Sequence, residues 1–266
     1  MPTNNKNANF VQMKTDNILH EIDGLKAKLS SLRPLPAEAV KKINDAMAIQ
    51  YTYDSNRIEG NTLTLQETAL VINEGVTISG KSMREHLEAM NHAEAIELIK
   101  DVAKKNVPIT EGVIKQLHGI VLHGIDKENA GKFRTVPVMI SGSEFVPPQP
   151  YLIMSDMEHF IAKYNELKSA HKTHPVMMAA FLHDELVRIH PFIDGNGRTS
   201  RLLMNLYLLR QGYPIISLKS DNDSKLRYYQ ALEKSHTTGD RSDFEEFIAE
   251  TVHDTLKKYL SFIEGE

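Results

Sequence analysis

The chain has 266 residues, of which 41% are hydrophobic and 25% charged, as in an ordinary globular protein. Its formal net charge is −4, so no basic excess indicates binding to nucleic acid or to an anionic membrane. Because there is no cysteine, disulfides, thiolate nucleophiles and cysteine-bound zinc are excluded.

The sequence shows no apolar segment typical of a secretion signal or of a membrane span. Residues 1–9 are polar and rich in asparagine, unlike the apolar core of a signal peptide. The longest apolar run, 176–182, is far shorter than the roughly 20 residues that a membrane span needs. We therefore expect a soluble, cytoplasmic protein with no membrane partner and no nucleic-acid partner.

Apolar residues at helical spacing predict that most of the chain is α-helical. In chain order, helices are expected over 16–33, 36–51, 55–60, 82–105, 110–123, 151–169, 175–189, 198–210, 223–236 and 242–263. Pro34 is expected to end the first helix, and Pro36 fits the first turn of the second. Three capping-box pairs mark helix starts: Thr64 with Glu67, Ser82 with Glu85, and Ser242 with Glu245.

One segment, 131–150, departs from the helical pattern. Two β-prone runs, 135–140 and 144–146, flank a glycine-bearing turn and predict a β-hairpin. Pro147, Pro148 and Pro150 stop the second run, so the hairpin would be a small exposed flap. The expected fold class is all-α, a helical bundle with one flap. An N-terminal helical region, 1–61, would precede a core formed by 62–266.

The segment 190–201 concentrates groups suited to phosphate chemistry. A helix ends at Pro191, and another begins near Arg198 after the turn Gly195-Asn196-Gly197. A glycine-rich turn at a helix N-terminus directs backbone N–H groups into an anion site. Arg198 and Arg201 share one side of the first helical turn, where their guanidinium groups can bind a polyphosphate.

Two further residues of this segment complete a reactive site. The Asp194 carboxylate is a suitable Mg²⁺ ligand beside phosphate oxygens. An unperturbed histidine has a pKa near ~6.5, so His190 can act as a general base at neutral pH. A base, a metal ligand, an anion site and two arginines within one loop predict phosphoryl or nucleotidyl transfer.

This segment resembles the signature of Fic-domain proteins, His-x-Phe-x-Asp/Glu-Gly-Asn-Gly-Arg-x-x-Arg, with every fixed position filled. The resemblance implies a Fic fold, ATP and Mg²⁺ as co-substrate and cofactor, and transfer of AMP to a Ser, Thr or Tyr hydroxyl of a target protein, the chain itself included. It implies that His190 is the base, that Asp194 holds Mg²⁺ and that Phe192 packs to hold the loop. The implied nucleotide-binding residues are Gly195, Asn196, Gly197, Arg198, Thr199, Ser200 and Arg201.

Two other segments extend the resemblance. Gly131-x-Phe133-Arg134 with 146–148 is similar to the family's flap, whose strand Val138, Met139, Ile140 and Ser141 would lie over the nucleotide and register a target segment. Tyr228-Tyr229 and the region up to Gly239-Asp240 resemble the lining of the family's adenine pocket, with His236 near its end.

The sequence Ser55-x-x-x-Glu59-Gly60 resembles the family's inhibitory motif, Ser/Thr-x-x-x-Glu-Gly/Asn. Its position before the loop implies that the inhibitor belongs to the same chain. The Glu59 carboxylate would pair with Arg201 in place of the γ-phosphate, so that ATP could bind only in a pose unsuitable for attack.

Other functions remain open at this point. The same site could remove AMP from a modified target, or the chain could be a nucleotide-sensing module that Glu59 keeps silent. A metal-dependent phosphohydrolase would instead use His183-Asp184 with His118, His123 and His190. The target, the nucleotide preference and the oligomeric state are not determined, although formation of a homodimer could relieve the inhibition.

Overall fold

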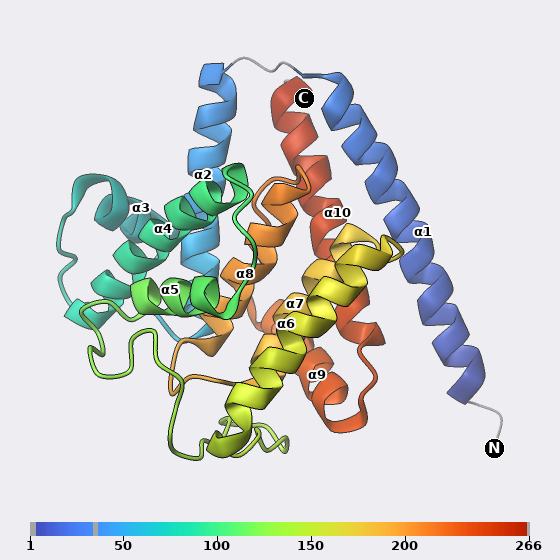
Figure 1. Ribbon diagram of the computed structural model, residues 1–266. Helices are drawn as coiled ribbons and strands as arrows, with labels where there is room; N and C mark the ends of the chain where they lie inside the picture. Colours follow the sequence, from blue (N-terminus) through green and yellow to red (C-terminus); the bar gives the residue numbers. More distant parts are fainter. Residues whose placement is uncertain (1–3, 34–36, 265–266) are drawn as a thin grey trace.

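The computed structural model of the protein describes residues 4–33 and 37–264. These residues form ten α-helices and one 3₁₀ turn, without a strand, which confirms the all-α class (Figure 1). The helices are α1 (Asn4–Ser31), α2 (Ala37–Ile58), α3 (Leu65–Glu74), α4 (Met83–Lys104), α5 (Glu111–Val121), α6 (Ile153–Ala170), α7 (Pro175–Ile189), α8 (Asn196–Arg210), α9 (Asn222–Thr238) and α10 (Ser242–Glu264), with the 3₁₀ turn η1 (Pro150–Leu152) before α6. Pro34 and Pro36 lie outside the described residues.

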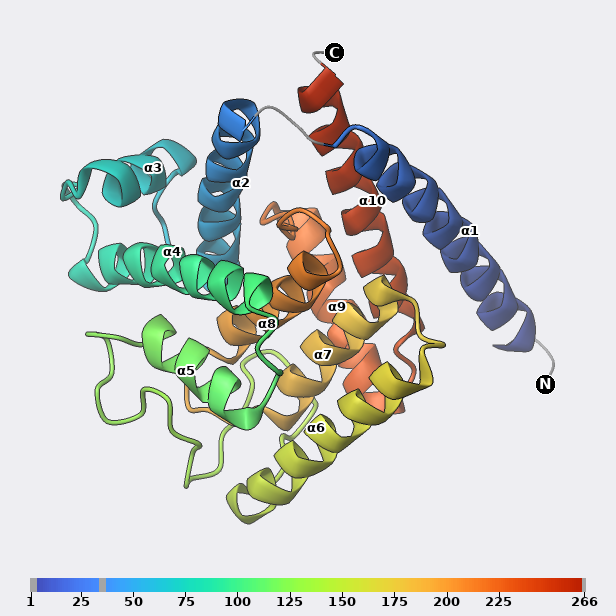
Figure 2. The same cartoon turned by 45° about the horizontal axis from the view of Figure 1, so that its top comes forward.

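Helix α8 lies at the centre of the bundle, next to α4 and α7, in both views (Figures 1 and 2). Its side chains are apolar on several faces, and Leu202, Leu203, Met204, Leu206 and Leu208 are all fully buried. A helix that is hydrophobic around its circumference is stable only inside the core. The N-terminus of α8 is therefore held rigidly by the packing of the helix behind it.

Helix α1 lies along α10 (Figures 1 and 2). Ile22 and Leu29 bury their side chains, and an ion pair joins Lys14 to Glu250 at 2.8 Å. This helix begins at Asn4, twelve residues before the predicted start at 16, because a polar sequence can continue a helix that its apolar residues have already docked.

Helix α2 is longer than predicted and includes Ser55, the first residue of the predicted inhibitory motif. The sequence predicts a separate short helix at 55–60, but α2 continues without a break to Ile58. Tyr51, Ser55 and Ile58 are buried and lie at helical spacing on one face, so packing against the core extends the helix. Gly60, with φ +100°, follows its end.

Two of the three predicted capping boxes are formed. Thr64 and Ser82 each accept the backbone N–H of the glutamate three residues later, and that glutamate bonds back. The third prediction is wrong, because Ser242 is already the first residue of α10 and its N–H donates to Asp240 Oδ1 at 3.0 Å.

The predicted β-hairpin at 131–150 is not formed, since this fully described segment contains no strand. Proline at 137, 147, 148 and 150 removes backbone donors that a ladder would need. The buried Arg134 organises the segment instead. Its guanidinium donates to the carbonyl oxygens of Val136 at 3.1 Å and Pro148 at 2.6 Å.

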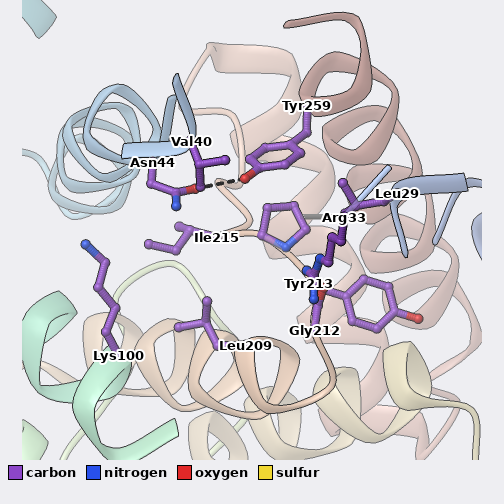
Figure 3. A pocket seen from close by; sticks show the side chains of 11 residues that line it. Leu29, Arg33, Val40, Asn44, Lys100, Leu209, Gly212, Tyr213, Ile215 and Tyr259 are labelled. Atoms are coloured by element: carbon purple, nitrogen blue, oxygen red, sulfur yellow. Dashed lines mark hydrogen bonds between the residues drawn. The ribbon is translucent and has the colours of Figure 1, made fainter. Parts of the chain in front are cut away.

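A cavity opens where α1, α2 and α10 approach the segment 212–215 (Figure 3). Asn44 and Tyr259 meet there through a hydrogen bond of 3.2 Å, and Arg33 and Lys100 also line the cavity. It contains no residue of the loop 190–201, so it is separate from the candidate site.

None of the helices described in the structure has both the length and the apolar character needed to cross a membrane.

Candidate active site

His190 stands at the C-terminus of α7 in a left-handed backbone conformation, with φ +50°. Its Nδ1 lies 3.2 Å from the carbonyl oxygen of Val187, which can only accept a hydrogen bond, so Nδ1 carries the proton. Burial, together with the nearby Arg134 and against the effect of the Val187 carbonyl, lowers the pKa of His190 to about 4. The imidazole is therefore neutral at pH 7, with Nε2 able to accept a proton.

Phe192 holds the loop that follows. Its side chain is fully buried and stacks on His118 with ring centroids 3.6 Å apart, as the predicted packing role requires. The Asn196 amide accepts the Phe192 N–H at 3.0 Å and donates to the Phe192 carbonyl at 2.9 Å. His118 Nε2 also lies 2.9 Å from the Asp194 carbonyl oxygen. These contacts give the loop one defined shape.

The N-terminus of α8 lies at the place where the sequence predicts an anion site. Gly195 caps the helix at φ +76°, so Asn196 and Gly197 belong to its first turn rather than to the loop. The first N–H groups of a helix have no partner within it and favour a negatively charged ligand. The side chains of Thr199 and Ser200 are buried, and the Ser200 hydroxyl donates to the Gly197 carbonyl at 2.9 Å. The Ser200 hydroxyl is therefore engaged within the helix.

Glu59 and Arg201 meet at this helix end, as the inhibitory motif predicts. Glu59 Oε1 accepts from Arg201 Nη2 at 2.7 Å. The Arg201 side chain is 1% exposed and also donates to the Ser55 hydroxyl and the Ser55 carbonyl, both at 2.9 Å. Burial opposes the charge of Arg201, but Glu59 and nearby hydroxyls raise its pKa above the usual value. A Cβ at Gly197 would collide with Glu59 Oε1, so glycine permits this close approach.

The two predicted adenine-site tyrosines have different environments. Tyr228 is buried, and its hydroxyl lies 3.3 Å from Arg201 Nη1 and 3.2 Å from His183 Nε2. Tyr228 therefore helps to hold the Arg201 side chain in position. Tyr229 is 42% exposed and donates to the Ile58 carbonyl at 3.0 Å, so it is the tyrosine open to a ligand.

Asp194 lies in a cluster of charges. Arg198 Nη2 reaches Asp194 Oδ1 at 3.2 Å, and Arg84 Nη2 from α4 reaches Oδ2 at 2.5 Å. Glu88 approaches Arg198 at 3.3 Å and Arg84 at 3.1 Å. Burial alone would raise the pKa of Asp194, but Arg198, the Gly195 N–H and Arg84 hold it below the usual value.

Sequence reasoning missed the roles of Arg84 and Glu88. Arg84 and Glu88 are four residues apart near the start of a helix, a spacing typical of a surface ion pair. This spacing therefore does not indicate a functional site. The sequence suggests His118 only as a possible ligand in the phosphohydrolase alternative, whereas in the structure it holds the loop 190–201. Its Nδ1 accepts the Gly131 N–H at 2.9 Å, and burial lowers its pKa to about 4.

Two residues of the segment 131–150, Arg134 and Phe145, contact residues of the candidate site. Arg134 Nε donates to the His190 carbonyl at 2.7 Å. Phe145 packs on His236 with ring centroids 5.0 Å apart, and His236 Nε2 lies 3.2 Å from Asp184. Of the predicted strand, Met139 and Ser141 are exposed, whereas Val138 and Ile140 are half-buried.

The residues of the phosphohydrolase alternative are not gathered into a metal site. Within the described part of the chain, no group of three or more His, Asp or Glu side chains could hold a metal ion. Asp184 instead binds Arg241 at 2.6 Å and the Ser235 hydroxyl at 3.0 Å. His183 is fully buried against Tyr228, as a hydrogen-bonding residue of the core.

Comparisons with known proteins point to one family. The model of the Fic/DOC family matches residues 108–208. A "Protein adenylyltransferase Fic" of Drosophila grimshawi is 37% identical over 258 residues, which covers 96% of this chain and 51% of that protein. The crystal structure of a Fic domain containing signaling protein from Bacteroides thetaiotaomicron superposes with a TM-score of 0.83 and 31% identity, covering 92% of this chain and 97% of that one. Fic-1 from C. elegans gives a TM-score of 0.87 at 27% identity, covering 99% and 79%.

The chain belongs to the Fic/DOC family, and its architecture is the Fic fold. It spans about half the length of the curated relatives that it matches.

Proposed function

We propose that the chain transfers AMP from Mg-ATP to a hydroxyl group of a protein. The observation that carries this proposal is the neutral His190, with Nδ1 bonded to Val187 and Nε2 free, beside the anion-binding N-terminus of α8. The curated relatives are named "Protein adenylyltransferase Fic", which supports transfer of AMP over its removal and over a silent sensing module.

In the proposed reaction, the target hydroxyl attacks the α-phosphorus of ATP. The new bond joins the hydroxyl oxygen to this phosphorus, the bond to the β-phosphate oxygen breaks, and pyrophosphate leaves with its electron pair. His190 Nε2 takes the hydroxyl proton. Arg198, Arg201 and the α8 N–H groups stabilise the phosphate charge, so catalysis rests on positioning and electrostatics.

The Asp194 carboxylate, in the loop 190–201, is suited to bind a magnesium ion. Asp194 has a side chain that is 43% exposed, and it already binds cationic groups at both oxygens. Hard carboxylate oxygens beside phosphate oxygens are the ligands that Mg²⁺ prefers. When bound there, the ion would neutralise charge on the phosphates, and Asp194 would hold it.

Glu59 would inhibit this reaction in the state that the structure describes. Its carboxylate takes the donor on Arg201 that a terminal phosphate would need, and it lies against Gly197 of the phosphate site. ATP could then bind only with its phosphates displaced. Release of Glu59 would open the site, and assembly into a homodimer is one event that could cause it.

The partner would be a protein that presents a Ser, Thr or Tyr hydroxyl, the chain itself included. Met139 is 90% exposed on the segment 131–150, which offers a surface for an extended target segment near His190.

The choice of label on ATP tests the reaction. The Glu59→Gly variant is incubated with a cell extract and labelled ATP. With α-labelled ATP, the label should become attached to protein. With γ-labelled ATP, the label should be released in pyrophosphate. Retention of the γ-label on protein would contradict the proposal and indicate phosphoryl transfer. Neither label on protein, with ATP bound to the folded variant, would indicate a binding module.

A further inference from the structure

The carboxylate assigned to the metal is paired with a cation from a distant part of the chain. Arg84 lies in the first turn of α4, and its Nη2 is 2.5 Å from Asp194 Oδ2. Its Nε is 3.1 Å from Glu88 Oε1, so one guanidinium bridges two carboxylates. The side chain of Arg84 is 56% exposed.

Four charges of alternating sign close a ring at this place. Arg84 binds Asp194, Asp194 binds Arg198, Arg198 approaches Glu88, and Glu88 binds Arg84. The two positive and two negative charges balance. A divalent cation at Asp194 would lie close to the guanidinium groups of Arg84 and Arg198. Like charges at such short range repel strongly in a partly buried site.

Only one of the two arginines is free to move away. The Arg198 side chain is 3% exposed and is enclosed by the core, whereas more than half of the Arg84 side chain faces solvent. An exposed arginine can change rotamer at little cost, since it exchanges one ion pair for water. Arg84 is therefore the group that must leave when a metal ion arrives.

We propose that Arg84 competes with the divalent cation for Asp194, as a second inhibitory contact besides Glu59. Glu59 covers the anion-binding side of the site through Arg201, and Arg84 covers its metal-binding side through Asp194. This inference rests on the proposed function, because it assumes a metal-nucleotide at Asp194. Arg84 acts as a positioning residue, since it contacts the metal ligand and not the reacting atoms.

The expected effect is moderate. An exposed ion pair contributes little to stability, and removal of a nearby positive charge adds to its effect on cation binding. We expect Arg84→Gln to tighten divalent cation binding about three- to tenfold.

The test measures metal binding rather than turnover. Free Mn²⁺ is followed by electron paramagnetic resonance as Mn²⁺ is added to equimolar protein and ADP, relative to ADP alone, for the wild type, Arg84→Gln and Lys105→Gln. Lys105 follows the opposite end of α4, about 30 Å from Arg84 at 1.5 Å per helical residue, so its substitution removes the same charge at a distance. Mn²⁺ should bind more tightly to Arg84→Gln and unchanged to Lys105→Gln.

An unchanged or weaker Mn²⁺ affinity of folded Arg84→Gln would overturn the proposal. Arg84→Lys provides a second variant, because its ammonium keeps the charge but cannot bridge both carboxylates, and its affinity should be intermediate. Asp194→Asn should abolish Mn²⁺ binding. If it does so while Arg84→Gln has no effect, the proposed function stands and the role of Arg84 fails. If Asp194→Asn still binds Mn²⁺, the metal is not held by Asp194 and the role of Arg84 fails, whereas the transfer of AMP is decided by the labelled-ATP experiment.

Discussion

At the scale of single residues, the surroundings of His190 keep its imidazole neutral, as the proposed base requires. The Val187 carbonyl selects the tautomer, and burial lowers the pKa of the imidazole to about 4. A buried histidine with a lowered pKa stays neutral as the pH falls, until the pH approaches that value. The imidazole should therefore be unprotonated throughout the range from pH 7.5 to pH 5.

We predict that the ring signals of His190 titrate with a midpoint near 4 in a nuclear magnetic resonance experiment. The His190→Asn variant identifies these signals by their disappearance. Because the unfolded chain takes up this proton near ~6.5, the same group makes the fold less stable as the pH falls from 6.5 towards 4. A midpoint near 6.5 would show that burial does not control this base.

Most of the candidate site could be predicted at this scale because it lies in one continuous loop. His190, Asp194 and Arg201 are close in sequence, so their chemistry can be recognised without a fold. Arg84 and Asp194 are 110 residues apart and meet only through the packing of α4 on α8. No pattern along the chain reports such a contact, so this part of the site needed the structure.

At the scale of elements, apolar periodicity predicts most of the helices, and the largest departures besides the early start of α1 are α2 and the segment 131–150. Helix α2 continues to Ile58 because Tyr51 and Ser55 remain on its buried face. The segment 131–150 has β-prone residues, but strand preference depends on a partner strand, and its prolines remove the donors. Local preference could not reveal that a single buried arginine organises this segment.

We predict that Arg134→Lys loosens this segment while the helical bundle stays folded. The guanidinium donates to three carbonyl groups, those of Val136, Pro148 and His190, and an ammonium cannot reach all three. Loss of charged hydrogen bonds should lower the free energy of unfolding by about 2 kcal/mol, measured by urea titration. Limited proteolysis within 136–149 should become faster.

The matched control is Lys132→Gln, which changes an exposed neighbour of the same segment. It should behave as the wild type. Equal proteolysis of Arg134→Lys and the wild type would show that other contacts hold the segment in place.

At the scale of the whole molecule, the N-terminal region up to Asn61 and the remainder share one apolar core. Ile22 of α1 and Ile58 of α2 belong to the same buried cluster as α7, α8 and α10. We propose that the boundary between 1–61 and 62–266 separates two roles rather than two folding units. The first part supplies inhibition through Glu59, and the second supplies the reaction.

The proposed inhibition depends on the position of helix α2. Helix α2 holds Ser55 and Glu59 against Arg201, so the inhibited state depends on how α2 packs on the core. Under the proposed function, the transfer of AMP should appear when the Glu59 carboxylate alone is removed.

The measurement that tests this account most directly is the transfer of α-labelled AMP to protein. The wild type, Glu59→Gly, Glu59→Gly with His190→Ala, and Glu38→Gly are incubated with Mg²⁺, ATP and a cell extract. Glu38, in the first turn of the same helix, is the control for loss of one carboxylate. Label should rise at least about tenfold in Glu59→Gly, which is the change expected when one strong charged contact is lost. It should return to background in the double variant and stay at the wild-type level in Glu38→Gly. Label that persists without His190, or no label from folded Glu59→Gly that binds ATP, would contradict the account.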